Sequence, residues 1–447
     1  MRDERDTVTY HRALEVRHQP DVLIVGGGPA GVAAGLAAAR QGASVRLVEA
    51  HGCLGGMGTA GMVPAFMQFT DGVNFLAGGV GREVLDALQA ADGTLPAPCG
   101  MDGMGIRAEV LKRVYDEMLA EAKVPFSFHT QVIDVPVHDG EVHEAVCAGK
   151  SGLFAIRAKV FVDCTGDGDL AALAGAPYEK GDADGNMMPG TLCSLWAGID
   201  WQKVQESGLG ARGSRMEEAF KDGVFTLEDR LLPGMWRVGA ALGGGNIGHA
   251  FQVDGTDEES LTRAYVWGRK SLQEYELYYK RYLKGFEEME LVATASLLGV
   301  RETRRIIGDY VLNIDDFTNQ SVFEDEVGRY SYPVDIHVTR PDKESFERFR
   351  KEFTSLRLGK GESYGIPYRV LTPKGLKNVL VAGRCVSTDR NVQASIRVMP
   401  GCYITGQAAG VAAAMTARKA TDTRGIDTRE LQARLKAMGA YLPNFKD

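Results

Sequence analysis

The sequence predicts an α/β fold whose mostly parallel sheet is assembled from segments that lie far apart in the chain. Residues 21–50, DVLIVGGGPAGVAAGLAAARQGASVRLVEA, place a glycine turn and a small-residue helical stretch between two apolar, β-branched runs. This is the pattern of two buried parallel strands joined by a helix. A strand, a glycine turn and a helix also follow one another in residues 158–175, AKVFVDCTGDGDLAALAG, and a further strand, NVLVAGR, comes at 378–384. We therefore expect one sheet that is interrupted by a long insertion.

The first segment carries the spacing of a dinucleotide-binding turn. Its G-x-G-x-x-G pattern directly follows the strand predicted at 21–25 and opens the helix predicted at 29–40. The first glycine permits a tight turn, the second lets backbone approach a pyrophosphate, and the third lets helix and strand pack closely. The next strand, 44–48, ends at an acidic residue that can accept hydrogen bonds from ribose hydroxyls. The predicted nucleotide-binding positions here are Gly26, Gly28, Pro29, Ala30, Gly31 and Glu49.

Two further G-x-G-x-x-G stretches lack this setting. GLGARG at 208–213 follows polar residues, and GGGNIG at 243–248 follows no β-branched strand. Because neither has a strand, a helix and an acidic residue in register, we do not expect either stretch to bind a nucleotide.

The remaining elements are read from periodicity and turn residues. We predict an amphipathic helix at 106–123 and two strands, 126–137 and 141–148, joined by a hairpin at Asp139-Gly140. Residues 398–410, VMPGCYITGQAAG, look helical although they contain three glycines, each of which costs a helix interior about 1 kcal/mol relative to alanine. Something must therefore lie very close to this helix.

Composition and charge exclude several classes of function. The net charge of −8 and pI near 5.6 disfavour nucleic acid or an anionic membrane surface as a partner. No apolar run is long enough to span a membrane, and the charged start has no signal core. The seven cysteines form no CxxC or Cys/His pattern, so we expect no metal site and a reducing, cytoplasmic location. The sequence allows a homo-oligomer.

Several stretches together resemble the FAD-dependent oxidoreductases of the two-dinucleotide-binding-domain group, and most resemble the bacterial branch distantly akin to fumarate reductase and succinate dehydrogenase flavoproteins. The resemblance implies a Rossmann-like FAD-binding domain with a three-layer, mostly parallel sheet, formed by residues 20–175 and 371–420. It also implies an inserted α+β substrate or cap domain at 176–370 and a C-terminal helical extension at 421–447. The stretches are VGGGPAG, LGGMGTAG, VDCTGDGDLAALAGAP, GVRETRRIIGDYVL, YPVDIH, YGIPYR and AGRCVSTDRNVQASIRVMPGCYITGQAAG.

FAD as the cofactor rests on this resemblance, because the glycine fingerprint alone would also allow NAD. The resemblance implies that the helix beginning at Pro400 points its N-terminus at the flavin, with Gly401 leaving room for the ring and Gly406 and Gly410 lying tight on the sheet. A plain small-residue packing helix is the alternative. Tethering of the flavin through His51 or Cys53 is left open. The further implied FAD-binding positions are Gly55, Gly56, Met57, Thr59, Val132, Thr165, Gly166, Asp167, Gly383, Arg384, Met399, Gly401 and Cys402.

Cationic groups in the insertion and before the last glycine-rich helix are the candidates for catalysis. Such groups can hold a carboxylate or hydroxyl substrate and can take or give a proton. Structural histidines and salt-bridged arginines are the alternative at each position. The cluster GVRETRR, if helical, cannot turn all of its arginines to one site. The predicted catalytic residues are His249, His337, Arg304 and Arg397, with Arg301, Arg305, Tyr368 and Arg369 also considered.

We expect an enzyme that transfers a hydride between flavin N5 and a small organic substrate. No second βαβ unit is visible, so a separate electron acceptor or donor is expected. A flavin monooxygenase, or a saturating reductase using transiently bound NAD(P)H, is the alternative enzyme. A non-catalytic flavin-binding protein is the alternative of another class. The tyrosines of residues 272–283 are read as helix packing.

Overall fold

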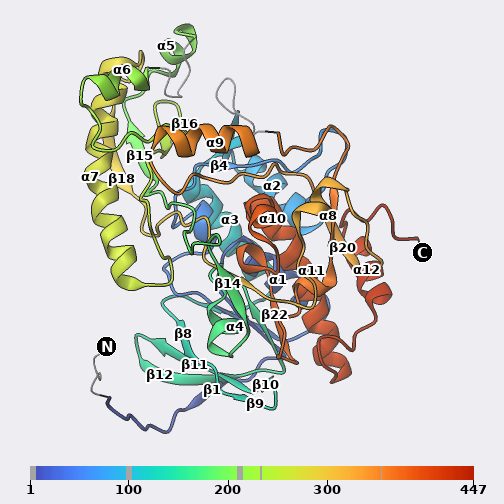
Figure 1. The fold of residues 1–447 in the computed structure, drawn as a ribbon. Helices are drawn as coiled ribbons and strands as arrows, with labels where there is room; N and C mark the ends of the chain where they lie inside the picture. The colour runs from blue at the N-terminus through green and yellow to red at the C-terminus, as the bar shows by residue number, and fades with distance from the viewer. Residues whose placement is uncertain (1–6, 97–102, 209–214, 232–233, 354, 447) are drawn as a thin grey trace.

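The predicted parallel sheet is present and joins segments from both ends of the chain. The computed structural model describes residues 7–96, 103–208, 215–231, 234–353 and 355–446. Its central five-stranded sheet has the order β22-β13-β2-β3-β7, and all four pairings are parallel (Figure 1). The bounds are β2 Val22–Val25, β3 Val45–Val48, β7 Phe126–Ser127, β13 Val160–Asp163 and β22 Val379–Val381.

Alternate side chains of β2 divide the sheet's surroundings into two layers. Val22 and Ile24 pack with helices of the main core, whereas Leu23 and Val25 pack toward a second, four-stranded sheet of order β1-β12-β11-β8. This second sheet lies at the bottom of Figure 1, and the labels of α1 and α11 lie above it. The fold is therefore a three-layer α/β structure. The bounds are α1 Pro29–Arg40, α2 Val80–Ala90, α3 Ala108–Glu121, α11 Met399–Lys419, β1 Val16–His18, β8 Gln131–Asp134, β11 Glu144–Gly149 and β12 Gly152–Arg157.

The glycines of α11 face another helix. A Cβ added at Gly406 would lie 2.3 Å from the carbonyl oxygen of Ala30, and one added at Gly410 would lie 2.2 Å from that of Ala34. Both alanines belong to α1. The expectation that these glycines fit the helix to the sheet was therefore wrong, because the backbone that excludes their side chains is that of α1.

The predicted strand at 126–137 is divided among three strands. β7 joins the central sheet, β8 pairs with β11 in the second sheet, and β9 pairs with β10. His129, at φ 50°, separates the first two strands, and Pro136, which has no N–H to donate, separates the last two. The hairpin at Asp139-Gly140 is confirmed, since β9 and β10 are antiparallel and both turn residues have positive φ. The bounds are β9 Val137–His138 and β10 Glu141–Val142.

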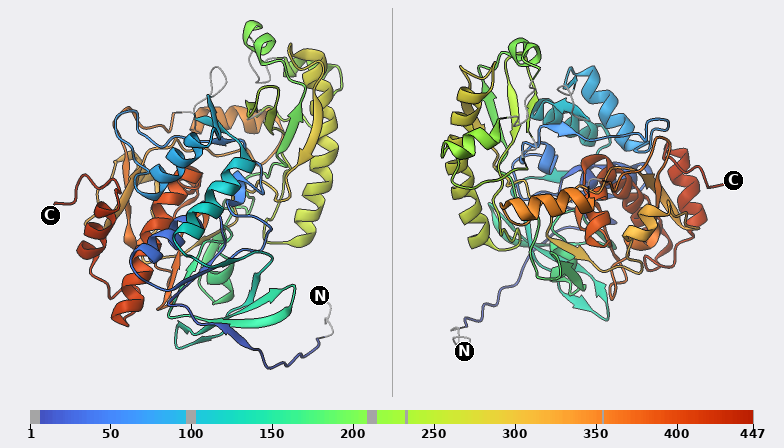
Figure 2. Two further views of the ribbon diagram at one scale, coloured as in Figure 1. Left: turned by 180° about the vertical axis from the view of Figure 1, so that it is seen from behind. Right: turned by 45° about the horizontal axis from the view of Figure 1, so that its top comes forward.

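The inserted region has its own apolar core, around an antiparallel sheet of order β16-β17-β15-β18 and the long helix α7. In both views of Figure 2 this helix lies at the edge of the molecule, away from α1 and α11. Tyr275, Tyr278 and Tyr279 of α7 are buried in that core, as predicted. The bounds are β15 Ser194–Ala197, β16 Gly234–Arg237, β17 Gly243–Asn246, α7 Glu258–Tyr282 and β18 Glu290–Thr294.

The stretch GGGNIG proves to be a strand with close neighbours. A Cβ at Gly244 would lie 2.3 Å from Pro64, and one at Gly245 would lie 2.6 Å from the Ser194 hydroxyl. These glycines admit neighbouring side chains, in agreement with the expectation that the stretch is no nucleotide site. The other excluded stretch, GLGARG, lies outside the described residues except for Gly208.

The arginine cluster GVRETRR is extended rather than helical, because Arg304 opens the strand β19, which pairs with β14. No helix in the described part of the chain combines the length and apolarity needed to cross a bilayer. The predicted domain limits stay a prediction. The other elements are β4 Ala65–Phe66, β5 Thr94–Pro96, β6 Met104–Ile106, α4 Asp169–Leu173, β14 Tyr178–Lys180, α5 Trp201–Glu206, α6 Met216–Lys221, β19 Arg304–Ile306, α8 Ile314–Thr318, β20 Glu326–Tyr330, α9 Lys343–Phe353, β21 Tyr364–Pro367, α10 Arg390–Ile396 and α12 Thr428–Ala437.

Candidate active site

In the glycine turn after β2, one glycine has no protein atom in the space that a side chain would occupy. Gly26 has φ +96°, and a Cβ there would lie 2.5 Å from the Cys164 carbonyl oxygen; a Cβ at Gly31 would lie 1.9 Å from the Gly26 carbonyl oxygen. Both positions therefore need glycine for the fold itself. A Cβ at Gly28 would meet no atom within 4 Å, and its φ of −67° suits any residue. The space above Gly28 is open to a bound group.

Glu49 lies at the end of β3, as predicted, and is buried. Its two carboxylate oxygens accept from the amides of Gly27 at 2.6 Å and His51 at 2.8 Å. The carboxylate is thereby fixed against the glycine turn. Each oxygen of an ionised carboxylate has a further acceptor site, so the side chain can still receive a ribose hydroxyl.

The strip at 54–61 lies directly on this turn. The amide of Gly55 donates to the Gly27 carbonyl at 2.8 Å, and a Cβ at Gly56 would lie 3.3 Å from Gly28 Cα. Gly55 and Gly56 both have positive φ. Thr59 is buried and donates to the Leu54 carbonyl at 2.5 Å. The structure thus brings two segments predicted to hold the same cofactor into contact.

Arg384 connects the loop after β13 to the inserted region. Its guanidinium donates to the Gly166 carbonyl at 3.0 Å, to Asp167 and to the Val300 carbonyl. Thr165 in the same loop donates to the buried carboxylate of Asp163 at 2.7 Å. The FAD-binding role implied for Arg384 stays a prediction, because in this structure its hydrogen bonds go to the protein.

One cavity, of about 280 Å³, is shared by these segments and the inserted region. The strip contributes Met57, and the start of α11 contributes Val398 and Met399. The first turn of a helix has free amides and a positive dipole end, so this wall of the cavity suits an anionic or electron-rich group. The remaining lining residues are Val63, Ala65, Met67, Cys193, Leu231, Trp236, Asn246, Gly299, Val300, Arg301, Tyr332, Asp335, His337, Arg384 and Arg397.

Arg301 is a buried cation of the cavity that has only neutral partners. In the described part of the chain its guanidinium donates to the Pro189 carbonyl at 2.9 Å, the Thr191 hydroxyl at 2.9 Å and the Asn246 amide oxygen at 3.2 Å. Burial, and next the charge of Arg397, lowers the pKa of Arg301 to about 10. The group therefore stays charged near neutral pH and is available to an anion.

Arg397 lies just before α11, as expected, and is held by Asp335. Its guanidinium donates to the Asp335 carboxylate at 3.0 Å and to the Asp335 carbonyl at 2.9 Å. Arg397 Nε is buried without a hydrogen-bond partner among the described atoms. Burial opposes the charge of Asp335, but His337, Arg397 and Arg301 hold the pKa of this carboxyl well below its usual range.

The two predicted catalytic histidines are neighbours. His249 Nε2 lies 2.9 Å from His337 Nδ1, and His249 Nδ1 lies 2.7 Å from the carboxylate of Asp229. His337 lines the cavity, whereas His249 lies behind it. Sequence reasoning missed Asp229, because it lies in an irregular segment with no motif around it.

Arg304 is the predicted catalytic residue that the structure places elsewhere. It is not among the cavity residues, and its guanidinium binds the Asp169 carboxylate at 2.7 Å and the Asp167 carbonyl at 3.1 Å. The extended backbone of this segment turns Arg301, not Arg304, into the cavity. Arg305 pairs with Glu302 and Arg369 pairs with Asp325.

Several other residues predicted to bind the cofactor are surrounded by atoms of the protein itself. A Cβ at Gly401 would lie 2.3 Å from the Ile396 carbonyl oxygen and 3.3 Å from the Tyr330 ring, so the protein itself requires this glycine. Val132 is buried among the residues between the two sheets, and Cys402 is buried at the start of α11. The amide of Gly383 donates to Thr405 at 3.0 Å. Their roles in cofactor binding stay predictions.

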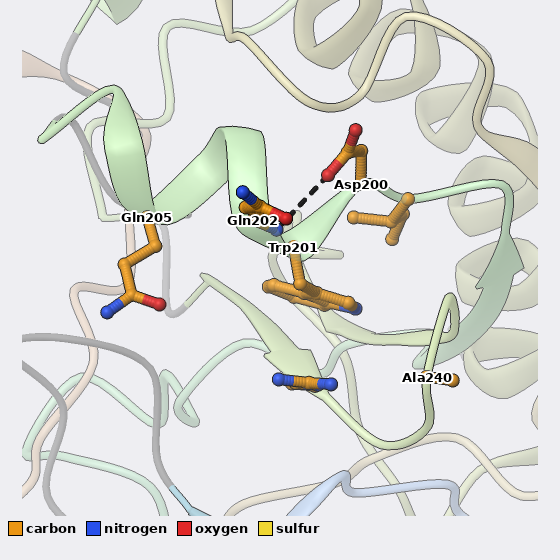
Figure 3. Close-up of a pocket in the computed structure, with 7 residues that line it drawn as sticks. Asp200, Trp201, Gln202, Gln205 and Ala240 are labelled. Atoms are coloured by element: carbon orange, nitrogen blue, oxygen red, sulfur yellow. Dashed lines mark hydrogen bonds between the residues drawn. The ribbon is translucent and has the colours of Figure 1, made fainter.

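A second cavity, of about 320 Å³, lies beside α5 (Figure 3). Asp200 caps this short helix by accepting from the Gln202 amide, and Trp201, Gln205 and Ala240 also line the space. None of the residues predicted for cofactor binding or catalysis lines it. We therefore place the candidate active site at the cavity beside α11.

Comparison with known proteins decides the family. The family model "FAD dependent oxidoreductase" matches residues 21–435. The chain belongs to the FAD-dependent oxidoreductase family. A thiamine thiazole synthase of Methanococcus aeolicus is 30% identical over 238 residues, which are 50% of this chain and 80% of the relative.

Solved structures similar to this FAD-dependent oxidoreductase include a reductase-like protein and a monooxygenase. A geranylgeranyl bacteriochlorophyll reductase-like protein of Thermoplasma acidophilum is 12% identical with a TM-score of 0.43, covering 94% of this chain and 83% of its own. The p-nitrophenol 4-monooxygenase of Pseudomonas putida is 14% identical with a TM-score of 0.42, covering 66% of this chain and 70% of its own.

FAD is therefore the cofactor of this enzyme, and the site fits it. The open space at Gly28 suits a pyrophosphate, and Glu49 suits a ribose. The strip and the start of α11 border one cavity, where a ring can lie. When bound, FAD supplies an acceptor or donor of a hydride.

Proposed function

We propose that this oxidoreductase transfers a hydride between flavin N5 and a small organic substrate that binds in the cavity beside α11. The observation that carries the proposal is the shared lining of this cavity. Met57 and Met399 come from the segments expected to hold the flavin, whereas Arg301 and His337 come from the inserted region. Groups that can bind and protonate a substrate thus share one space with the cofactor's surroundings.

The charges around the cavity favour a substrate with a carboxylate or an ionisable hydroxyl. Three arginines line the cavity, but Asp335 is the one carboxylate among its lining residues. Arg301 is buried and donates to neutral oxygens, and a buried cation is costly until an anion pairs with it. An anionic group of the substrate would supply that partner.

A separate electron acceptor or donor completes the proposed reaction. In the described residues, the GGGNIG stretch forms strand β17 and leaves no nucleotide-binding turn there. Electrons would leave or enter through dioxygen, a quinone or a transiently bound NAD(P)H. We infer no activity from the thiamine thiazole synthase, because the alignment covers half of this chain.

Anaerobic reduction of the FAD holoenzyme tests the proposal. Small hydroxy acids, amino acids and dicarboxylates are added in turn, and bleaching of the flavin absorption is followed; the reduced enzyme is then mixed with quinone, dioxygen or NAD(P)⁺. We expect at least one carboxylate-bearing compound to bleach the flavin. If none of the compounds bleaches the flavin but dithionite reduces it readily, the result would support the alternative of a non-catalytic flavin protein.

A monooxygenase or a saturating reductase is the alternative enzyme. It predicts NAD(P)H oxidation that depends on substrate, with dioxygen uptake and a hydroxylated product for the monooxygenase. The cavity counts against a long apolar lipid, because Arg301, Asp335 and Arg397 face it and burying their charges against hydrocarbon is unfavourable.

A further inference from the structure

Three buried side chains form a hydrogen-bonded line that ends at the cavity. Asp229 Oδ2 lies 2.7 Å from His249 Nδ1, and His249 Nε2 lies 2.9 Å from His337 Nδ1. The side chain of His249 is fully buried, and those of Asp229 and His337 are nearly so. Of the three, His337 alone lines the cavity. The line therefore connects the cavity to a buried carboxylate.

The carboxylate determines where the protons lie. An ionised carboxylate is an acceptor only, so His249 donates from Nδ1, and in neutral His249 the Nε2 atom accepts. His337 must then donate from Nδ1, which leaves its Nε2 without a proton. His337 Nε2 lies 3.5 Å from the carboxylate of Asp335, which also lines the cavity. The ring nitrogen on the cavity side of the line is therefore ready to take a proton.

We propose that Asp229, His249 and His337 form a proton relay in which His337 Nε2 exchanges a proton with the substrate while His249 holds the positive charge. The relay rests on the proposed function for its substrate. When the substrate is oxidised, its C–H bond breaks and the hydride, with both electrons, goes to FAD. The O–H or N–H proton of the substrate goes to His337 Nε2, and the Nδ1 proton of His337 moves to His249 Nε2. Reduction of a substrate reverses these transfers.

The neighbouring charges explain why the charge moves to His249. His337 faces Asp335 and Arg301, and Arg397 pairs with the other carboxylate oxygen of Asp335. Burial, and next the charge of Arg301, lowers the pKa of His337 to about 3, so a lasting cation on His337 is unfavourable. His249 has the Asp229 carboxylate at hydrogen-bond distance. His337 is thus the catalytic residue, and His249 and Asp229 are positioning residues.

Magnetic resonance of the FAD holoenzyme, isotopically labelled in its histidine nitrogens, tests the relay without any substrate. His249→Asn and His337→Gln assign the signals. Near neutral pH we expect both rings to carry their proton on Nδ1. As the pH is lowered, a second proton on His249 should appear together with a change of His337 from Nδ1–H to Nε2–H, because the two rings share one hydrogen bond. A protonated Nε2 on His337 at neutral pH, a doubly protonated His337, or no change in either ring would overturn the proposal.

Asp229→Asn tests the carboxylate, with Asp254→Asn as the matched control because Asp254 pairs with Lys180 away from the cavity. We expect Asp229→Asn to retain FAD but to lose the coupled change in protonation of His249 and His337, whereas the control variant keeps this change. An unaltered titration in Asp229→Asn would contradict the relay. The wild-type titration decides the matter if this variant does not fold.

The relay and the proposed function fail in different ways. A wild-type enzyme with the coupled change, whose flavin no compound bleaches, would contradict the proposed function and leave the relay standing. A flavin that a carboxylate compound bleaches, in an enzyme without the coupled change, would contradict the relay alone.

Discussion

At the scale of single residues, the glycines of the dinucleotide turn are required for different reasons, although each occupies a glycine position of the same motif. Gly26 and Gly31 are required because protein backbone occupies the space of a side chain, whereas the space at Gly28 is open. Gly28 is also the N-cap of α1, with extended backbone and no side-chain cap. The fold and the cofactor can therefore be tested separately at this residue.

Gly28→Ser should bind FAD weakly while the apoprotein stays as stable as the wild type. Serine is at least as good an N-cap as glycine, so we expect a free energy of unfolding that is unchanged or higher by only about a few tenths of a kcal/mol. The new side chain would occupy the space into which a pyrophosphate must come. Denaturant unfolding of the apoprotein and a titration with FAD measure the two effects. Unaltered FAD affinity would place the pyrophosphate elsewhere.

Arg301→Gln should weaken the binding of small carboxylates. A hydrogen bond to a charged group contributes about 1.5–3 kcal/mol, which corresponds to roughly a 10- to 100-fold change in affinity. Perturbation of the flavin spectrum by simple mono- and dicarboxylates measures it. Arg304→Gln is the matched control, because Arg304 binds Asp169 outside the cavity, and it should bind as the wild type does. Equal affinities in the two variants would contradict an anion site at Arg301.

At the scale of elements, α1 and α11 form the central helix pair behind the cofactor turn. Small residues let the two backbones approach until a methyl group no longer fits between them, as at Gly406 and Ala30. The same α1 begins at the glycine turn, and the same α11 begins at the cavity. Their spacing therefore sets the distance between the two segments expected to hold FAD.

Gly406→Ala should destabilise the protein despite the better helix propensity of alanine. Propensity favours the change by about 1 kcal/mol, but the methyl group would lie 2.3 Å from the Ala30 carbonyl oxygen, and overpacking of this kind costs about 1–3 kcal/mol. Gly35→Ala is the control, since its Cβ would meet its nearest neighbour, Leu119, at 3.6 Å, and it should stabilise. Denaturant midpoints measure both, and a more stable Gly406→Ala would show that the helices move apart freely.

At the scale of the whole molecule, the sequence predicted those elements that a short-range pattern of residues determines. β2, α1 and β3 match their predicted ranges to within a residue, because strand, turn and helix follow one another directly. The partition of residues 126–137 among three sheets depends on long-range pairing that no local pattern contains. Asp229 was missed for the same reason, since its partner His249 is its neighbour only in the folded chain.

Removal of FAD should loosen the main core more than the core of the inserted region. A cofactor present at 100 times its Kd stabilises the native state by about 2.7 kcal/mol, and this stabilisation acts where the cofactor binds. The glycine turn and the start of α11 belong to the main core, whereas α7 packs in a separate one. Hydrogen exchange of the holoprotein and apoprotein should therefore show lost protection in α1 and α11 and retained protection in α7. Equal losses in α7 would mean that the two cores open as one unit, because only then does cofactor binding energy reach the inserted helix.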